Sequence, residues 1–355
     1  MTLDLAIVGG GVLGCLAADE AARRHPEWTT AVLDSRAPGS GATSWSAAAD
    51  FPLAATDGHR ELVRASDDYW REAVGSPISR LVRRVPMIYV TARDRLAALE
   101  GRVVDRGLRP ANRSELRRMA EILPDMVLVP DEVVVTHDEP GSVLPARAFV
   151  EALLTTGPAA RTTEVHPGQH VLDIESADGV YRLRTPGVRW EARRVILAVG
   201  PWEAPAVNGR AVAAPPTRVK RVAALRSRLP VRVGDPLVYF LDDDLFVLPV
   251  ARGVALISFY RDVWDVAPHG MDGSVDGSDL EEGLRALSAR SRLAAEGVVG
   301  GQAFCDRYTE QRLPFVWTTG ELPGLAAVLA GSGSGVRLGP GLARRAVHAV
   351  GREER

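Results

Sequence analysis

The sequence predicts an α/β protein in which a dinucleotide-binding domain is interleaved with a second, β-rich domain. Residues Leu3–Val8 form a continuous apolar run, typical of a buried parallel strand. A glycine-rich turn and a helical stretch follow, and a second β-branched run ends at Asp34, which makes a unit of the size of one βαβ crossover. Segments of this α/β kind at both ends of the chain bracket a middle rich in short strands, so each domain is expected to combine separate pieces of chain.

The turn after the first strand carries the spacing Gly9-x-Gly11-x-x-Gly14, and Asp34 ends the next strand. Gly9 permits a tight turn, Gly11 lets the backbone approach a pyrophosphate at the positive end of a helix, and Gly14 permits close helix–strand packing. An aspartate at this spacing can accept hydrogen bonds from a ribose. The pattern is a Rossmann-type fingerprint that does not separate NAD from FAD. The cofactor contacts expected here are Gly9, Gly11, Val12, Leu13, Gly14, Asp34, Ser35 and Arg36.

Composition excludes several other classes of protein. The 355 residues suffice for two packed domains, and the formal net charge of −2 gives no basic field for nucleic acid. No apolar run is long enough to span a membrane, and the N-terminus does not resemble a signal peptide. Two cysteines indicate reduced thiols, so we expect a cytoplasmic protein whose oligomeric state stays open. His166 and His170 lie in a predicted turn with no third ligand nearby, so no metal site is expected.

Five stretches, taken in order, resemble segments of the D-amino-acid oxidase family of flavoproteins, which includes glycine oxidase and sarcosine oxidase. These stretches are SRAPGSGATSWSAAA (35–49), LPARAFVEAL (144–153), HVLDIE (170–175), VILAVGPW (195–202) and AGSGSGVRLGP (330–340). The last stretch, a glycine-rich loop, departs from the family because it is one residue shorter and has serines where relatives have His or Asn. The resemblance extends over nearly the whole chain.

The resemblance implies an FAD-binding domain made of residues 1–80, 143–215 and 300–355, and a substrate-binding domain made of 81–142 and 216–299. It implies FAD as the cofactor: the first stretch wraps the pyrophosphate, the backbone of Val171 touches the adenine, and the C-terminal loop lies against the flavin ring. The further cofactor contacts that it implies are Ala42, Thr43, Ser44, Ser46, Val171, Ala198, Gly200, Trp202, Gly333, Ser334, Gly335 and Val336.

The resemblance also implies the chemistry, namely oxidation of an amine or amino acid by hydride transfer from the carbon bearing the amine to flavin N5, which gives an imine. Two alternatives stay open. One is a dehydrogenase of a 2-hydroxy acid or amino acid that passes electrons to a carrier other than oxygen, and the other is a catalytically inactive flavin-bound partner protein. Some oxidases of the family activate oxygen with a lysine in the strand corresponding to VALISFY (254–260). That strand is apolar here, and Lys220, the only lysine, lies elsewhere.

Arg307 falls where the amino-acid oxidases of the family place the arginine that binds the substrate carboxylate. A planar guanidinium matches a carboxylate with two parallel hydrogen bonds. The alternative is a structural salt bridge to an acidic neighbour such as Glu310. By the same resemblance the middle sheet covers the substrate side of the flavin, and Tyr239 and Tyr260 are expected to line the substrate pocket, with ordinary sheet packing as the alternative.

Cys305 stands two residues before Arg307. In the sarcosine-oxidase branch of the family, a cysteine in this C-terminal strand is bonded through sulfur to the 8α-methyl carbon of the flavin, and Cys305 falls at the corresponding position. A neighbouring cation would raise the thiolate fraction that such a bond needs. The alternative is a buried cysteine that only packs. The sequence therefore leaves open whether FAD is covalently attached through Cys305.

Overall fold

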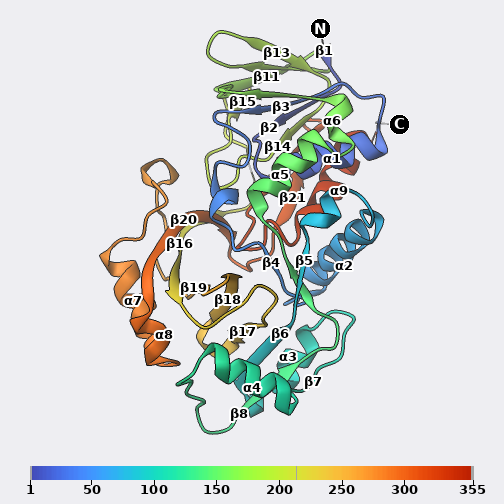
Figure 1. Ribbon diagram of the computed structural model, residues 1–355. Helices are drawn as coiled ribbons and strands as arrows, with labels where there is room; N and C mark the ends of the chain where they lie inside the picture. The colour runs from blue at the N-terminus through green and yellow to red at the C-terminus, as the bar shows by residue number, and fades with distance from the viewer. Residues whose placement is uncertain (1, 213, 353–355) are drawn as a thin grey trace.

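The fold is described from a computed structural model, which covers residues 2–212 and 214–352 (Figure 1). Figure 1 shows two lobes, with both ends of the chain in the upper one. Chain segments alternate between the lobes, as the run of colours along the ribbon makes visible. The predicted interleaving of an α/β domain with a β-rich domain is therefore confirmed. Among the described residues, no helix combines the length and hydropathy that crossing a membrane would require.

A six-stranded sheet forms the centre of the upper lobe. Five neighbouring strands are parallel, and the sixth is antiparallel at one edge. The strand order is that of a Rossmann-type sheet, with the glycine-rich turn at the end of a central strand. Across the sheet the strands are β10 (Thr163–Pro167), β3 (Thr30–Asp34), β2 (Leu5–Val8), β14 (Val195–Leu197), β22 (Leu325–Leu329) and β21 (Phe315–Thr318).

The two faces of this sheet have different covers. Leu5 and Ile7 of β2 pack with helices, while Ala6 and Val8 pack with a second sheet, because successive side chains of a strand point to opposite faces. The helices are α1 (Val12–Arg24), α2 (Asp57–Glu72), α5 (Ala146–Thr155), α6 (Ala159–Thr162) and α9 (Gly339–Gly351). The second sheet has the order β1 (Thr2–Leu3), β13 (Arg189–Ala192), β12 (Val180–Arg184), β11 (Asp173–Ala177) and β15 (Ala206–Val207).

An eight-stranded sheet forms the lower lobe. Its order is β20 (Val298–Thr309), β16 (Thr217–Arg228), β19 (Val254–Ser258), β18 (Leu245–Ala251), β17 (Leu237–Phe240), β6 (Met87–Ala92), β8 (Glu132–Thr136) and β7 (Arg109–Pro110). The pairing of β17 with β6 is parallel and the others are antiparallel, so the sheet is mixed, as predicted. Its helices are α3 (Leu96–Arg102), α4 (Arg113–Ile122), α7 (Gly277–Ser288) and α8 (Arg292–Glu296).

The lobes are joined by strands and short helices between them. The small sheet β4 (Ala49–Asp50), β9 (Gly141–Val143) and β5 (Arg83–Val85) connects them. Strand β20 pairs with β16 as far as Thr309, so the segment predicted to enter the FAD-binding domain at residue 300 stays in the eight-stranded sheet for ten more residues. The 3-10 helices are η1 (Ala42–Trp45), η2 (Ile78–Leu81), η3 (Arg93–Arg95), η4 (Leu241–Asp243) and η5 (Pro268–Gly270).

The glycines of the fingerprint are required by close backbone packing. Gly9 has a φ of 107°, and a Cβ there would overlap the carbonyl of Ala198, which directly follows β14. A Cβ at Gly14 would overlap the carbonyl oxygen of Gly9. Because both obstacles are backbone atoms, a side chain cannot be accommodated by a change of rotamer. The start of α1 therefore lies directly against the end of β2.

We predict that Gly14→Ala lowers the free energy of unfolding by about 1–3 kcal/mol, the usual cost of overpacking, and reduces cofactor retention. Urea unfolding followed by circular dichroism would measure the first effect. Gly101→Ala is the matched control, since Gly101 lies in α3 with nothing within 4 Å of its added Cβ. Equal stability of the two variants would contradict the packing argument.

Candidate active site

The N-terminus of α1 is bordered by polar groups from two other segments. The hydroxyl of Thr43 in η1 accepts a hydrogen bond from the Val12 N–H at 3.0 Å. The Asp34 carboxylate accepts hydrogen bonds from the Gly10 N–H at 2.6 Å and the Arg36 N–H at 2.7 Å. Burial raises the pKa of Asp34, and these two hydrogen bonds oppose the rise. Hydrogen bonds to the Asp34 carboxylate and the Thr43 hydroxyl thus fix the backbone of the predicted dinucleotide-binding turn.

The stretch VILAVGPW lies against the stretch that contains η1. The Arg36 guanidinium stands 5.2 Å from the centre of the Trp202 ring, and a Cβ at Gly41 would meet that ring at 2.9 Å. Gly200 has a φ of 66°, which turns the chain after β14. Val171 and Ala198 are buried nearby in the same lobe. Small residues therefore leave exposed backbone around the start of α1, which fits a dinucleotide with its pyrophosphate at a helix N-terminus.

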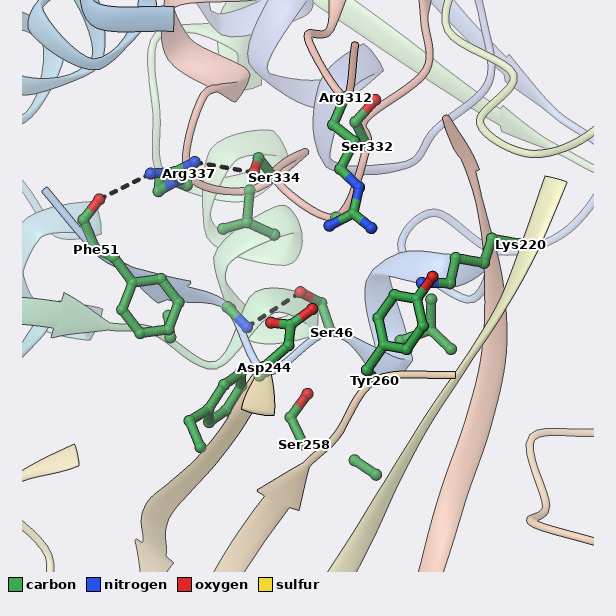
Figure 2. Close-up of a pocket in the computed structure, with 18 of the residues that line it drawn as sticks. Ser46, Phe51, Lys220, Asp244, Ser258, Tyr260, Arg312, Ser332, Ser334 and Arg337 are labelled. Carbon is green, nitrogen blue, oxygen red and sulfur yellow. Dashed lines mark hydrogen bonds between the residues drawn. The ribbon is translucent and has the colours of Figure 1, made fainter. Parts of the chain in front are cut away.

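A cavity of about 280 Å³ opens where the two lobes meet (Figure 2). The stretch after η1 contributes Ser46–Ala49, and the C-terminal loop contributes residues 332–334 and Val336. The middle sheet contributes Tyr239, Phe246, Ser258 and Tyr260 among others. Both tyrosines expected to line the pocket do line it, and so do four of the predicted cofactor contacts, Ser46, Gly333, Ser334 and Val336.

The end of β20 orients the C-terminal loop. The buried carboxylate of Asp306 accepts hydrogen bonds from the Gly333 N–H at 2.7 Å and from the Arg307 N–H at 2.8 Å. The Ser332 N–H donates to the Arg307 carbonyl at 3.0 Å. Burial raises the pKa of Asp306, and the hydrogen bonds from Gly333 and Arg307 oppose that rise. Gly333 has a φ of 74°, so the loop has a left-handed turn beside the cavity.

Two hydroxyl groups of the cavity wall are bonded to carboxylates. The Tyr239 hydroxyl donates to Asp244 at 2.8 Å, and the Tyr260 hydroxyl donates to Asp262 at 3.0 Å. Burial raises the pKa of both tyrosines, and their carboxylate partners add to the rise, so both stay neutral at physiological pH. Neither is poised as a phenolate base.

The cationic groups of the cavity fall into two sets. Arg221 and Arg261 are ion-paired with Asp279 of α7. Lys220, Arg312, Arg337 and Arg102 also line the cavity, and among the residues described here none of these four has a carboxylate within ion-pair distance. The Lys220 ammonium lies 3.8 Å from the centre of the Tyr260 ring. Burial and then the nearby Arg312 guanidinium lower the pKa of Lys220 to about 8.

Arg337 is held rigidly beside the C-terminal loop. Its guanidinium donates to the carbonyl of Phe51 at 2.9 Å, to that of Leu53 at 2.5 Å and to the Ser334 hydroxyl at 3.0 Å. Burial lowers its pKa, and the Asp50 carboxylate opposes that effect. Figure 2 shows the bonds to Phe51 and Ser334 as dashed lines. The cavity thus contains a fixed positive charge at the base of the loop.

Arg307 lies outside the cavity lining. Its guanidinium donates to the carbonyls of Pro201 at 2.7 Å and Trp202 at 2.9 Å, and to the Thr217 hydroxyl at 3.1 Å. Successive strand residues face opposite ways, and Phe304 and Tyr308 are the residues of β20 that line the cavity. In the structure Arg307 therefore does not face the cavity expected to hold the substrate carboxylate, and it makes no salt bridge to Glu310. Its guanidinium instead stabilises the turn after β14.

Cys305 lies on the same face of β20 as Arg307 and is buried, with 4% of its surface exposed. It does not line the cavity. Burial, with a smaller contribution from Asp306, raises the pKa of its thiol to about 11, and Arg307 only partly opposes this. The expected increase in thiolate fraction is therefore reversed, because desolvation of the thiolate outweighs the neighbouring cation.

A second cavity of about 470 Å³ lies on the other side of β4. Ala49 lines the first cavity and Asp50 the second, since they are adjacent strand residues. Burial raises the pKa of Asp50 to about 6. Although larger, this cavity contains no residue of the glycine-rich turn or the C-terminal loop, so the first cavity is the candidate active site.

Sequence reasoning missed three cationic groups of the cavity and one carboxylate: Lys220, Arg312, Arg337 and Asp244. Lys220 was noticed as the only lysine, but nothing local connects β16 with the strand VALISFY. Asp244 lies between the paired strands β17 and β18, where an aspartate is a common turn residue. Arg312 and Arg337 follow a strand and a glycine-rich loop, and only the folded chain directs them into one space.

Comparison with known proteins agrees with this geometry. The model of the family described as FAD dependent oxidoreductase (DAO) matches residues 4–349. Glycine oxidase from Geobacillus kaustophilus is 21% identical, with a TM-score of 0.75 over 100% of this chain and 96% of that chain. L-proline dehydrogenase from P. horikoshii is 15% identical, with a TM-score of 0.81 over 99% and 93%. The L-α-glycerophosphate oxidase from Mycoplasma pneumoniae, solved with FAD bound, is 12% identical, with a TM-score of 0.79 over 99% and 96%.

No curated protein sequence matches the chain. The Rossmann-type sheet, the open glycine turn and the cavity beneath the C-terminal loop define a flavin-dependent oxidoreductase. The family model spans nearly the whole chain, and the protein therefore belongs to the DAO family of FAD-dependent oxidoreductases. The resemblance noted in the sequence is confirmed, and with it FAD as the cofactor of the family.

We predict that Arg307→Leu destabilises the protein by about 2–3 kcal/mol, because charge-assisted hydrogen bonds are lost and two carbonyls lose a donor. Activity on carboxylate-bearing and carboxylate-free substrates should fall to the same extent. Thermal unfolding and the two activities would be compared with those of Thr217→Val, which removes one hydrogen bond to the same guanidinium and should cost about 1 kcal/mol. A stable Arg307→Leu protein with selective loss of carboxylate substrates would restore the role implied by the family.

Proposed function

We propose that this protein oxidises the C–N bond of an amine or amino acid and releases an imine, which water hydrolyses. The observation that supports this most is the cavity in which the C-terminal loop, residues 46–49 and the aromatic face of the middle sheet meet. A dinucleotide cradle beside a small cavity with an excess of cations suits a substrate that carries an acid as well as an amine.

FAD would be held by the glycine turn, Asp34 and the η1 stretch, with its ring beside Ser46 and the loop 332–336. When bound, it supplies a two-electron acceptor for the hydride on the carbon that bears the amine. The contribution of the chain is to hold and orient the substrate. No side-chain base is required if the amine binds neutral, and both tyrosines are kept in the hydroxyl form by burial.

Three adjacent aromatic rings of the cavity wall, those of Phe51, Tyr239 and Phe246, would exclude water from one side of the substrate. The centres of the Phe51 and Tyr239 rings lie 5.3 Å apart, and those of Tyr239 and Phe246 lie 5.8 Å apart. Arg337, fixed at the base of the loop, offers a positive charge to the substrate carboxylate. We assign the carboxylate to Arg337 in place of Arg307, because Arg337 lines the cavity and Arg307 does not.

The electron acceptor is the point on which the alternatives differ. Lys220 reaches the cavity from β16 although VALISFY itself contains no lysine, which supports an oxidase more than the sequence alone did. Similar folds carry both oxidases and a dehydrogenase by name. Release of hydrogen peroxide during turnover in air identifies the oxidase, and turnover only with an artificial carrier identifies the dehydrogenase.

We predict that the purified protein is yellow and that its FAD is held without a covalent bond. Acid precipitation should leave a colourless pellet under a yellow supernatant, because a buried thiol with a raised pKa forms little thiolate. Reversed-phase chromatography of the supernatant would identify FAD. A coloured pellet that becomes colourless in Cys305→Ala would instead establish the tether through Cys305.

We predict that anaerobic addition of one or more members of a panel of amino acids and secondary amines bleaches the flavin absorbance near the visible maximum. The corresponding 2-hydroxy acids serve as the comparison panel. Bleaching by hydroxy acids alone would replace C–N with C–O oxidation. A spectrum unchanged by every member of both panels would leave the inactive flavin-bound partner protein as the answer.

A further inference from the structure

We infer that Lys220 and Arg312 form a second anion site in the cavity, so that the substrate is an amine with two acidic groups. This inference rests on the proposed function and deepens it. Figure 2 shows Arg337 on one side of the cavity and Lys220 with Tyr260 on the other, while the Arg312 guanidinium points into the space between them. A substrate with one acid would use Arg337 and leave the second pair without a partner.

The two cations of the second site are close to each other, and the nearby carboxylates of Asp244 and Asp262 lie beyond ion-pair distance. Both cations stand over the same ring, with Lys220 Nζ 3.8 Å and the Arg312 guanidinium carbon 5.8 Å from the centre of Tyr260. Within residues 2–212 and 214–352, neither side chain has an ion pair or a recorded hydrogen bond. Two like charges kept together in this way repel each other, and a bound anion would remove that repulsion.

Of the two cations, Lys220 is buried among aromatic rings and Arg312 is an exposed residue of the cavity lining. Lys220 is only 6% exposed and is surrounded by the rings of Tyr260, Trp264 and Tyr308. Arg312 has a φ of 54°, a left-handed conformation that costs free energy in a residue with a side chain. Its N–H donates to the Thr309 carbonyl at 3.0 Å, which stabilises this turn and directs the side chain into the cavity.

Two other arginines of the same cavity are neutralised by ion pairs with the protein. Arg221 is bonded to Asp279 at 2.5 Å, and Arg261 is paired with both Asp279 and Glu282. Asp279 and Glu282 thus neutralise Arg221 and Arg261, and among the described residues Lys220 and Arg312 have no such ion pair. Asp244, the carboxylate that lines the cavity, already accepts the Tyr239 hydroxyl. An acid group of the substrate is the remaining partner for Lys220 and Arg312.

The test compares matched ligands that cannot be oxidised, on the holoprotein at constant ionic strength. Malonate, succinate and glutarate are titrated against propionate, butyrate and valerate, and the shift of the flavin visible spectrum gives each Kd. At least one dicarboxylate should bind about 10- to 100-fold more tightly than its matched monocarboxylate, as expected for an added charge-assisted hydrogen-bonded pair. The ratio of the monocarboxylate Kd to the Kd of the matched dicarboxylate measures this preference. Lys220→Met and Arg312→Gln should each reduce this ratio toward one.

Arg93→Gln is the matched control, because Arg93 is exposed on η3, outside the cavity, and the substitution removes one positive charge. A ratio near one in the unmodified protein overturns the inference. A reduction by Arg93→Gln as large as that by Arg312→Gln overturns it too, because the effect would then be long-range. A lower FAD content in Arg312→Gln, with an unchanged ratio in the fraction that keeps FAD, would assign Arg312 to the cofactor and also overturn it.

A second readout follows from Lys220 being the only lysine. Reductive methylation with ¹³C-formaldehyde labels its amine and the N-terminal amine alone, and NMR gives the pKa of each. The charged and titratable groups that influence Lys220 are Arg312, Asp244 and Asp262, with the rings of Tyr260 and Tyr308 beside it. A bound dicarboxylate should raise the pKa of labelled Lys220, and a monocarboxylate should not. Equal shifts with both ligands overturn the inference.

Failure of this inference is distinguishable from failure of the proposed function. If simple amino acids bleach the flavin and the dicarboxylate ratio is one, the amine oxidation stands and the second anion site falls. If the ratio is large and falls in the Lys220 and Arg312 variants, but no amine with one or two acids bleaches the flavin, the anion site stands and the proposed chemistry falls.

Discussion

The cavity depends on how the end of β20 ties the substrate sheet to the FAD-binding domain. The buried Asp306 carboxylate holds the C-terminal loop through the Gly333 N–H, and Arg307 next to it holds the turn after β14 through two carbonyls. The end of β20 therefore restrains both the C-terminal loop and the turn after β14. Hydrogen bonds stabilise these half-buried charged groups and restrain both loops, although the Arg307 Nε–H has no partner among the described residues.

The arrangement of charge in the cavity follows from the same fold. Strand β16 crosses the sheet so that Lys220 lies over the cavity while the adjacent Arg221 reaches Asp279 of α7. Of these two adjacent cations, Arg221 is thus neutralised by an ion pair and Lys220 faces aromatic rings. Lys220 keeps a lowered pKa because burial and Arg312 both disfavour its charged form, and the carboxylates of Asp244 and Asp262 compensate only in part.

Sequence reasoning succeeded where a function depends on local backbone geometry. The glycine spacing predicted a tight turn at Gly9 and close packing at Gly14, and an added Cβ at either position would overlap backbone atoms. Tyr239 and Tyr260 were identified through the family resemblance and do line the cavity. Reasoning was weaker at Cys305 and Arg307, because adjacency in sequence suggested a shared site while the alternation of a strand decides which face each side chain takes. That face is turned away from the cavity, toward the turn after β14.

The sequence by itself determined the Rossmann-type unit, the family and FAD, since these rest on glycines, a strand-ending aspartate and short ordered motifs that act over a few residues. Only the tertiary structure decided which charges meet in the cavity. Lys220, Arg312 and Arg337 come from β16, the turn after β20 and the C-terminal loop, and no periodicity connects them. Whether each cation is paired, buried or directed at a substrate depends on groups far away in sequence, because electrostatic interaction depends on distance in space and on burial.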